Sequence, residues 1–212
     1  MSTVHKKNFF NFFPTPKYLE FSEMGLAFSD TNIRFIEFTS GGKLLELKNY
    51  GEEPIPAGII TSGYVNDLPN LIVALKAFKS KYNFTYIKAT LPEEKAYLFK
   101  TTVPNVSKEA LRDSVGFTIE ENVPLSLAEV IYDFIVIGEN NEQKENVDVA
   151  GTVLPTKTVK AYIETLSSAG FVPVSFETES QAIARAVVER GDKRSHLIIN
   201  ISKKKTGLYV VE

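Results

Sequence analysis

The sequence predicts a mixed α/β fold, and three observations lead to that prediction. Of the 212 residues, 43% are hydrophobic and 24% are charged, a composition typical of globular proteins. Apolar runs over residues 24–28 and 33–38, separated by the turn-forming residues 29–32, predict a β-hairpin near the start of the chain. Further along, stretches with helical spacing of apolar residues alternate with short apolar runs, which indicates helices packed across sheets.

The first part of the chain predicts three antiparallel strands, a crossover helix and a fourth strand. The predicted strands cover residues 24–28, 33–38, 43–50 and 86–91. Gly41-Gly42 supplies the turn before the third strand, and Asp67 is the predicted cap of a helix that runs to about Tyr82. Both faces of the second strand are largely apolar, so we expect both to be covered. This order calls for a helix packed across a mixed sheet.

A break at residues 92–94 precedes a predicted strand-helix-strand-strand unit. Its strands cover residues 95–103, 130–137 and 147–154. Ser107 is the predicted cap of its helix over 108–121, and residues 138–142 form a polar connection that we expect at the surface. A unit of about sixty residues is near the lower limit for an independent core, so we expect it to lean on its neighbour.

The last part of the chain predicts a helix, a strand, a second helix and a closing hairpin. Thr156 or Thr158 is the predicted cap of the first helix, which Gly170 ends because glycine suits a left-handed C-cap. The following elements are predicted at residues 171–176, 179–190, 196–201 and 207–211. We therefore divide the chain into a tail, a first lobe, an inserted unit and a terminal hairpin, at residues 1–21, 22–92 with 155–193, 93–154 and 194–212.

Charge and residue counts exclude several classes of function. Lysine and arginine number 24 against 26 aspartates and glutamates, for a net charge of −2, so the chain has no general field to attract nucleic acid. Cysteine is absent, which excludes disulfides and thiolate ligands, and a multi-histidine metal site or a serine-histidine triad would have to use His5 or His196, the only histidines. Glu93 and Glu94 are adjacent, so their side chains are expected to point apart and make a poor catalytic pair.

The first 21 residues form a tail rich in phenylalanine. Four phenylalanines lie within residues 9–13, behind Lys6 and Lys7. The apolar stretch is too short to span a membrane and has no small-residue cleavage site, so we expect an uncleaved, cytosolic chain. Two interpretations stay open: the phenylalanines pack onto their own domain or a partner, or they insert into a membrane surface while the lysines meet anionic lipid.

Three stretches of the chain together resemble one known family. Residues 25–38 resemble its opening hairpin, residues 50–65 (YGEEPIPAGIITSGYV) resemble its glycine- and proline-rich loop, and residues 180–186 (SQAIARA) resemble one of its helices. The family is that of the PilM-type proteins, the actin-like components of type IV pilus assembly, which are similar to the cell-division protein FtsA. The resemblance implies an actin-like, ribonuclease H-like first lobe with an inserted strand-helix-strand-strand subdomain. It also implies that residues 194–212 begin a second lobe.

The chain departs from the actin-like pattern at both phosphate-binding hairpins. Actin-like ATPases present Asp-x-Gly in each hairpin, where the carboxylate organises a metal ion and the glycine lets backbone amides approach phosphate. Here residues 27–29 read Ala-Phe-Ser and residues 200–202 read Asn-Ile-Ser. We therefore expect no catalytic residue, no metal site and no bound cofactor. The residues that could remain as vestigial phosphate ligands are Ser29, Asp30, Thr31, Asn200, Ser202 and Thr206.

The resemblance implies a noncatalytic scaffold of the pilus assembly platform, at the cytoplasmic face of the inner membrane. Its implied partner is the N-terminal cytoplasmic peptide of a PilN-type membrane protein, held between the first lobe and the inserted subdomain. Self-association through the inserted subdomain is implied as well. Two alternatives stay open. One is an ATP- and magnesium-binding ATPase of which this chain is a truncated piece, and the other is an FtsA-like division scaffold.

Overall fold

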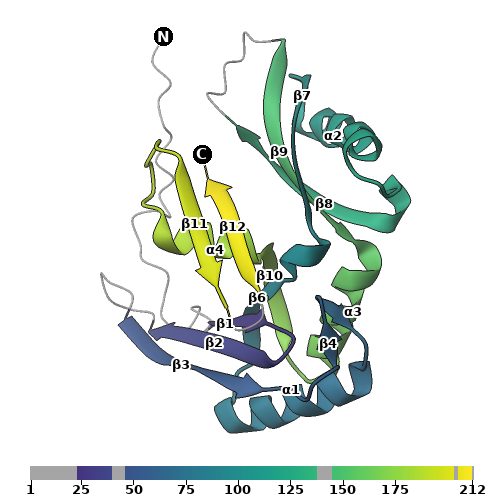
Figure 1. The fold of residues 1–212 in the computed structure, drawn as a ribbon. Helices are drawn as coiled ribbons and strands as arrows, with labels where there is room; N and C mark the ends of the chain where they lie inside the picture. The colour runs from purple at the N-terminus through teal and green to yellow at the C-terminus, as the bar shows by residue number, and fades with distance from the viewer. Residues whose placement is uncertain (1–22, 40–45, 138–144, 203–204, 212) are drawn as a thin grey trace, which may run out of the picture.

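Figure 1 shows the chain as a computed structural model, which describes residues 23–39, 46–137, 145–202 and 205–211. Five strands form the larger sheet, in the order β10-β6-β1-β2-β3. Their bounds are β1 Glu23–Phe28, β2 Asn32–Thr39, β3 Glu46–Pro54, β6 Tyr86–Leu91 and β10 Val172–Thr178. The first three strands are antiparallel neighbours, whereas β6 and β10 run parallel to β1. This is the ribonuclease H-like order that the resemblance implied.

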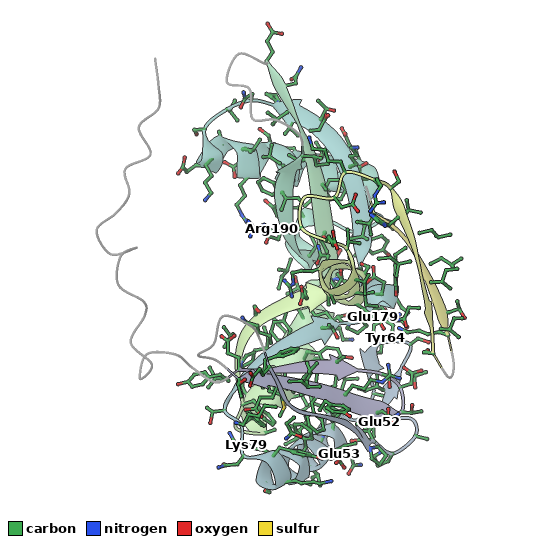
Figure 2. The ribbon with its side chains drawn as sticks, turned by 90° about the vertical axis from the view of Figure 1, so that its left-hand side faces the viewer. Glu52, Glu53, Tyr64, Lys79, Glu179 and Arg190 are labelled. Carbon is green, nitrogen blue, oxygen red and sulfur yellow. The ribbon has the colours of Figure 1, made fainter. Side chains whose placement is uncertain are left out.

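Two helices cover one face of this sheet, α1 (Leu68–Tyr82) and α3 (Thr156–Ser168). The Asp67 side chain accepts a hydrogen bond from the Asn70 backbone N–H at 3.1 Å, so the predicted cap is confirmed. The apolar stripe of α1 packs on side chains of alternate sheet positions. The fully buried members of this core include Met24, Ile33, Leu71, Leu75, Ile87 and Leu166. The opposite face carries α4 (Glu179–Val187), which Figure 2 shows above the sheet, with α1 below.

The expectation that both faces of the second strand are covered is wrong. Ile36 and Phe38 are each 40% exposed, and Tyr50, which pairs with Ile36 on β3, is 70% exposed. The reason is that α4 is short and packs against β10 and β6, so it does not extend over β2 and β3 at the other edge of the sheet.

A small hairpin, β4 (Ile60–Thr61) with β5 (Tyr64–Val65), was not predicted. Its turn residues Ser62 and Gly63 both have positive φ, and serine gives little sequence signal for that conformation. Gly63 is required here for space as well as for conformation, because a Cβ atom would lie 2.3 Å from the Cβ of Pro92. The hairpin therefore packs directly against the point where the chain leaves the first lobe.

The inserted subdomain has the predicted order of strand, helix, strand and strand. Its elements are the 3₁₀ turn η3 Glu93–Lys95, β7 Tyr97–Pro104, α2 Lys108–Asn122, the 3₁₀ turn η4 Leu127–Glu129, β8 Val130–Ile137 and β9 Asn146–Pro155. The strands form an antiparallel sheet in the order β7-β9-β8, and α2 covers one of its faces. Ser107 caps α2 as predicted, by accepting from the Ala110 N–H. The turns predicted at Gly41-Gly42 and at residues 138–142 lie outside the described residues.

Three details of the last part differ from the predictions. The residue before α3 is Pro155, which caps no backbone N–H, and Thr158 is buried inside the helix, so neither threonine is the cap. Instead α4 has the side-chain cap, a reciprocal pair of hydrogen bonds between Thr178 and Gln181. That helix ends at Val187 rather than at residue 190, because Val188 has turned to extended backbone. The hairpin of β11 (His196–Ile201) and β12 (Thr206–Val211) forms a separate sheet.

The helix α1 offers a matched test of the core. Leu75 is fully buried, so Leu75→Ala is expected to destabilise the fold by about 2–5 kcal/mol through lost burial and a residual cavity. Val73 lies on the same helix and is 63% exposed, so Val73→Ala is expected to change stability by roughly 0.5 kcal/mol or less. Urea unfolding followed by circular dichroism measures both, and similar losses in the two variants would contradict the described packing.

Candidate functional site

The two turns predicted as vestigial phosphate loops meet at one cavity of about 490 Å³. Ser29, Asp30 and Thr31 line it from the β1–β2 turn, and Ser202 and Thr206 line it from the β11–β12 turn. Residues from opposite ends of the chain therefore lie together, as the resemblance to paired hairpins implied. We call this space the turn cavity.

The hydroxyl groups of the two serines in the turn cavity, Ser29 and Ser202, are bonded within their own turns. Ser29 Oγ donates to the Asn32 carbonyl at 3.0 Å and accepts from the Asn32 N–H at 3.0 Å. Ser202 Oγ likewise donates to the Lys205 carbonyl at 2.8 Å and accepts from the Lys205 N–H at 3.3 Å. Serine at these positions stabilises a tight turn, so each hydroxyl already has the bonds that a phosphate would have to replace.

Asn200 is the one predicted ligand that does not line the turn cavity. Its side-chain amide donates to Glu179 Oε1 at 3.1 Å, so it faces the start of α4. Asparagine therefore supplies a donor to a neighbouring carboxylate at the position where an actin-like ATPase carries an acid.

The charges that line the turn cavity oppose a polyphosphate. Its lining contains four carboxylates, those of Asp30, Glu93, Glu94 and Glu179, against the cations Arg34 and Lys205. Arg34 lies 3.5 Å from Glu52, so this guanidinium already has an anionic partner. An incoming phosphate chain would approach an excess of negative charge in a partly enclosed space.

Lys205 joins two of these carboxylates. Its ammonium group lies 2.9 Å from Glu94 Oε1 and 2.8 Å from Glu179 Oε2. Burial alone would lower the pKa of Lys205, but its hydrogen bonds to Glu179 and Glu94 outweigh that effect and raise the pKa. Burial, the largest single effect, would similarly raise the pKa of Glu94, but the hydrogen bond from Lys205, a backbone hydrogen bond and the charges of Lys205 and Lys95 together outweigh it and lower the pKa. Lys205 and Glu94 are therefore both charged at neutral pH.

The turn η3, where the chain enters the inserted subdomain, is held from several sides. Glu93 accepts from the Ser180 hydroxyl at 2.8 Å and from the Ser180 N–H at 2.9 Å, at the first turn of α4. The Lys95 ammonium lies 3.6 Å from the centre of the Tyr64 ring on β5. Glu93 and Glu94 point to different partners, as predicted from their adjacency. We call η3 together with Pro92 the junction.

A second and larger cavity, of about 1,050 Å³, lies between the inserted subdomain and the first lobe. Figures 1 and 2 show the three-stranded sheet of the inserted subdomain on one side of it, with α4 and β12 near the other. The wall on the subdomain side is the face of the sheet away from α2, and it carries Leu98, Ile131 and Ile135 with exposures of 55%, 42% and 69%. We call this cavity the groove.

The groove is bordered by a strand edge with free hydrogen-bonding groups. Four consecutive residues of β12, Leu208 to Val211, line it, as expected where a strand presents its edge. Within the described residues β12 pairs only with β11, which leaves its other edge open. The edge of β8 is different, because the Phe134 N–H bonds to Asp133 Oδ1 at 3.0 Å and the Tyr132 carbonyl accepts from Arg112 at 3.4 Å.

Sequence reasoning did not find the groove residues or the bonds of Lys205. Leu98, Ile131 and Ile135 follow the alternation of ordinary strands, and only the pairing of β7, β9 and β8 shows that they share an uncovered face. The one usable signal was the small size of the inserted unit, which predicted contact with its neighbour.

The sheet order, the crossing helices and the inserted unit define the first lobe of an actin-like fold, so the predicted fold class is confirmed. The chain belongs to the family of the type IV pilus assembly protein PilM, because the model of that family matches residues 25–212.

Two solved structures show the same fold. A PilM-PilN type IV pilus biogenesis complex matches with 22% identity and a TM-score of 0.79, over 90% of this chain and 58% of the other. The cytoplasmic domain of EpsL, an inner-membrane component of the type II secretion system of Vibrio cholerae, matches with 12% identity and a TM-score of 0.60, over 90% of this chain and 71% of the other. The chain thus spans less than two thirds of its match in the PilM-PilN complex.

Among the residues that the structure describes, no helix combines the length and the apolar character needed to cross a bilayer. No group of three or more histidine, aspartate or glutamate side chains among them is placed to hold a metal ion.

Glu93 is expected to fix the junction to α4. Glu93→Ala removes both hydrogen bonds that Ser180 donates, one of them from a backbone N–H in the first turn of the helix, and should cost about 1–2 kcal/mol. Ser180→Ala keeps the bond from the backbone N–H to the Glu93 carboxylate and removes only the hydroxyl contacts to Glu93 and Thr178, so it is expected to cost less. Urea unfolding of the two variants checks this order, and an unchanged free energy of unfolding in Glu93→Ala would contradict the role.

Proposed function

We propose that this chain is a noncatalytic scaffold of type IV pilus assembly, and that its groove docks the N-terminal cytoplasmic segment of a PilN-type membrane protein. Membership of the PilM family supports a role in type IV pilus assembly. One of the similar solved structures is that of a PilM-PilN complex, which supports the partner. This chain spans only 58% of its match in that complex. A PilN-type partner is therefore a proposal for this chain.

One observation carries the proposal: the groove joins an open strand edge to an uncovered apolar face. An extended peptide can pair its backbone with the edge of β12 at residues 208–211, while its alternate side chains meet Leu98, Ile131 and Ile135. Backbone pairing gives affinity for any extended segment, and the apolar wall selects segments with apolar residues at alternate positions. Lys100 and Asp133 on the same wall supply one charge of each sign.

The turn cavity supports the noncatalytic part of the proposal. The hydroxyls of Ser29 and Ser202 are bonded within their own turns, the two cations of the cavity are paired with carboxylates, and four carboxylates line it. Stabilising the negative charge that develops in phosphoryl transfer requires donors or cations aimed at that charge, and the paired groups are already committed. The chain would then act by holding partners at the cytoplasmic face of the inner membrane.

Self-association is the second contact that we propose, through the inserted subdomain. Phe117 on the outer face of α2 is 78% exposed, which is unusual for so large an apolar side chain. It lies on the side of the subdomain away from the groove, so this contact would leave the groove open.

A peptide titration tests the docking. The cytoplasmic N-terminal peptide of the PilN-type protein from the same organism is expected to bind saturably, as followed by calorimetry. Ile135→Asp places a charge on the apolar wall and should weaken binding at least about tenfold, roughly 1.4 kcal/mol. Phe117→Asp is the matched control away from the groove and should bind as tightly as the unsubstituted chain. No binding at millimolar peptide, or equal loss in both variants, would contradict the proposal.

A thermal-shift measurement tests the absence of a nucleotide function. ATP with magnesium is expected to leave the melting temperature unchanged, since both cations of the turn cavity are paired with carboxylates and the hydroxyls of Ser29 and Ser202 are bonded within their own turns. A true ligand at about 100 times its dissociation constant would stabilise the fold by about 2.7 kcal/mol, which is easily detected. The docking peptide serves as the positive control, and a saturable shift with ATP would support the ATPase alternative.

A further inference from the structure

The ion bridge at Lys205 connects three parts of the chain that are far apart in sequence. Lys205 precedes β12, Glu94 lies in the junction and Glu179 is the first residue of α4. The ammonium lies within 2.9 Å of both carboxylates, and its side chain is 38% exposed. The attraction between a half-buried cation and two carboxylates is stronger, and less screened by salt, than the attraction in an ordinary surface ion pair.

Little else among the described residues holds the β11–β12 hairpin against the body of the molecule. The hairpin is a separate two-stranded sheet, so no strand pairing fixes its position. One of its faces carries five apolar side chains that are 55–79% exposed, namely Leu197, Ile199, Ile201, Leu208 and Val210. The side-chain bonds that join the hairpin to α4 and the junction come from Lys205 and Asn200, which both bond to Glu179, while His196 on β11 lies 3.2 Å from Asp192 in the preceding loop.

The Glu94 end of the ion bridge is held by more contacts than the hairpin end. Glu94 belongs to the junction, where Glu93 is bonded to α4 and Lys95 lies on Tyr64. The same junction leads directly into β7, whose residues 98–100 form part of the groove wall. The distance between the edge of β12 and the wall of the groove is therefore set through Lys205.

We propose that Lys205 is a positioning residue for partner binding, which holds the edge of β12 at a fixed distance from the apolar wall so that the groove is ready-made. This inference rests on the proposed docking function, but the placement of the hairpin can be measured without any partner. Lys205 supplies the positive charge between Glu94 and Glu179 from within the chain, so the arrangement requires no added metal ion or nucleotide. Without that charge the two carboxylates would repel one another across the bridge.

The chain permits a direct distance measurement, because it contains no cysteine. Ile199 on the hairpin and Asp113 on α2 are exposed and do not line the groove, so Ile199→Cys and Asp113→Cys can each carry a spin label. Pulsed electron paramagnetic resonance then gives the distribution of the label-to-label distance across the groove. We expect a narrow distribution with Lys205 present and a broad or shifted one in Lys205→Met, which removes the charge and keeps the length of the side chain. Lys205→Arg, which keeps the charge, should restore the narrow distribution.

The control is Lys88→Met. Lys88 forms a single ion pair with Glu23, at the opposite end of β1 from the turn cavity, and its side chain is 50% exposed. This substitution should leave the label distance unchanged. An unchanged distribution in Lys205→Met, or equal broadening in Lys205→Met and Lys88→Met, would overturn the positioning role.

Peptide affinity is measured in the same variants without labels. Lys205→Met is expected to bind the PilN-type peptide about tenfold more weakly, because the hairpin of this variant is no longer held in place and must be ordered when the peptide binds. Lys205→Arg and Lys88→Met should bind normally. A broadened distance with unchanged affinity would overturn the link between Lys205 and docking. If the unsubstituted chain binds no peptide, the proposed function fails, and the distance distribution alone still decides whether Lys205 places the hairpin.

Discussion

The fixed junction at Pro92 and η3 is the constraint on which the rest of the site depends. The five-stranded sheet is interrupted after β6, and about sixty residues of the inserted subdomain follow before the chain returns in α3. Such a subdomain could rotate about its two connections. Glu93 bonds to α4, Lys95 lies on Tyr64, and Gly63 packs against Pro92, so three separate contacts oppose that rotation at the first connection. These contacts fix the apolar wall of the groove relative to the first lobe.

Two cavities share the elements around the junction, yet their chemistry differs. Glu93 and Tyr209 line both of them. The turn cavity is rich in paired charges and self-bonded hydroxyls, which leaves few groups for a new ligand. The groove has an apolar wall and an open strand edge, which are the features that an extended peptide uses. In actin-like ATPases the two turns that line the turn cavity bind nucleotide. In this chain they would instead hold a protein-binding surface in place.

Some local features were predictable from the sequence, although the cap of α3 and the end of α4 were not, whereas the contacts between distant residues that shape the site were mostly not predictable. Asp67 and Ser107 cap their helices as predicted, because a cap involves residues only three positions apart. The meeting of the two turns followed from the resemblance to paired hairpins. The bonds of Lys205 were not predictable, since Glu179 is 26 positions away and Glu94 is 111 positions away. From the sequence alone, a lysine in a turn is expected to be solvated. The uncovered faces of β2 and β8 were not predictable either, because they depend on where short helices end.

The central claim is that a peptide binds between the edge of β12 and the sheet of the inserted subdomain. Nuclear magnetic resonance with labelled protein and unlabelled PilN-type peptide tests it most directly, by locating the backbone amides that change on binding. The account predicts changes concentrated at residues 208–211 and on β7 and β8, with slowed exchange of the β12 amides. Changes concentrated instead around Ser29 to Thr31, with β12 unaffected, would contradict it.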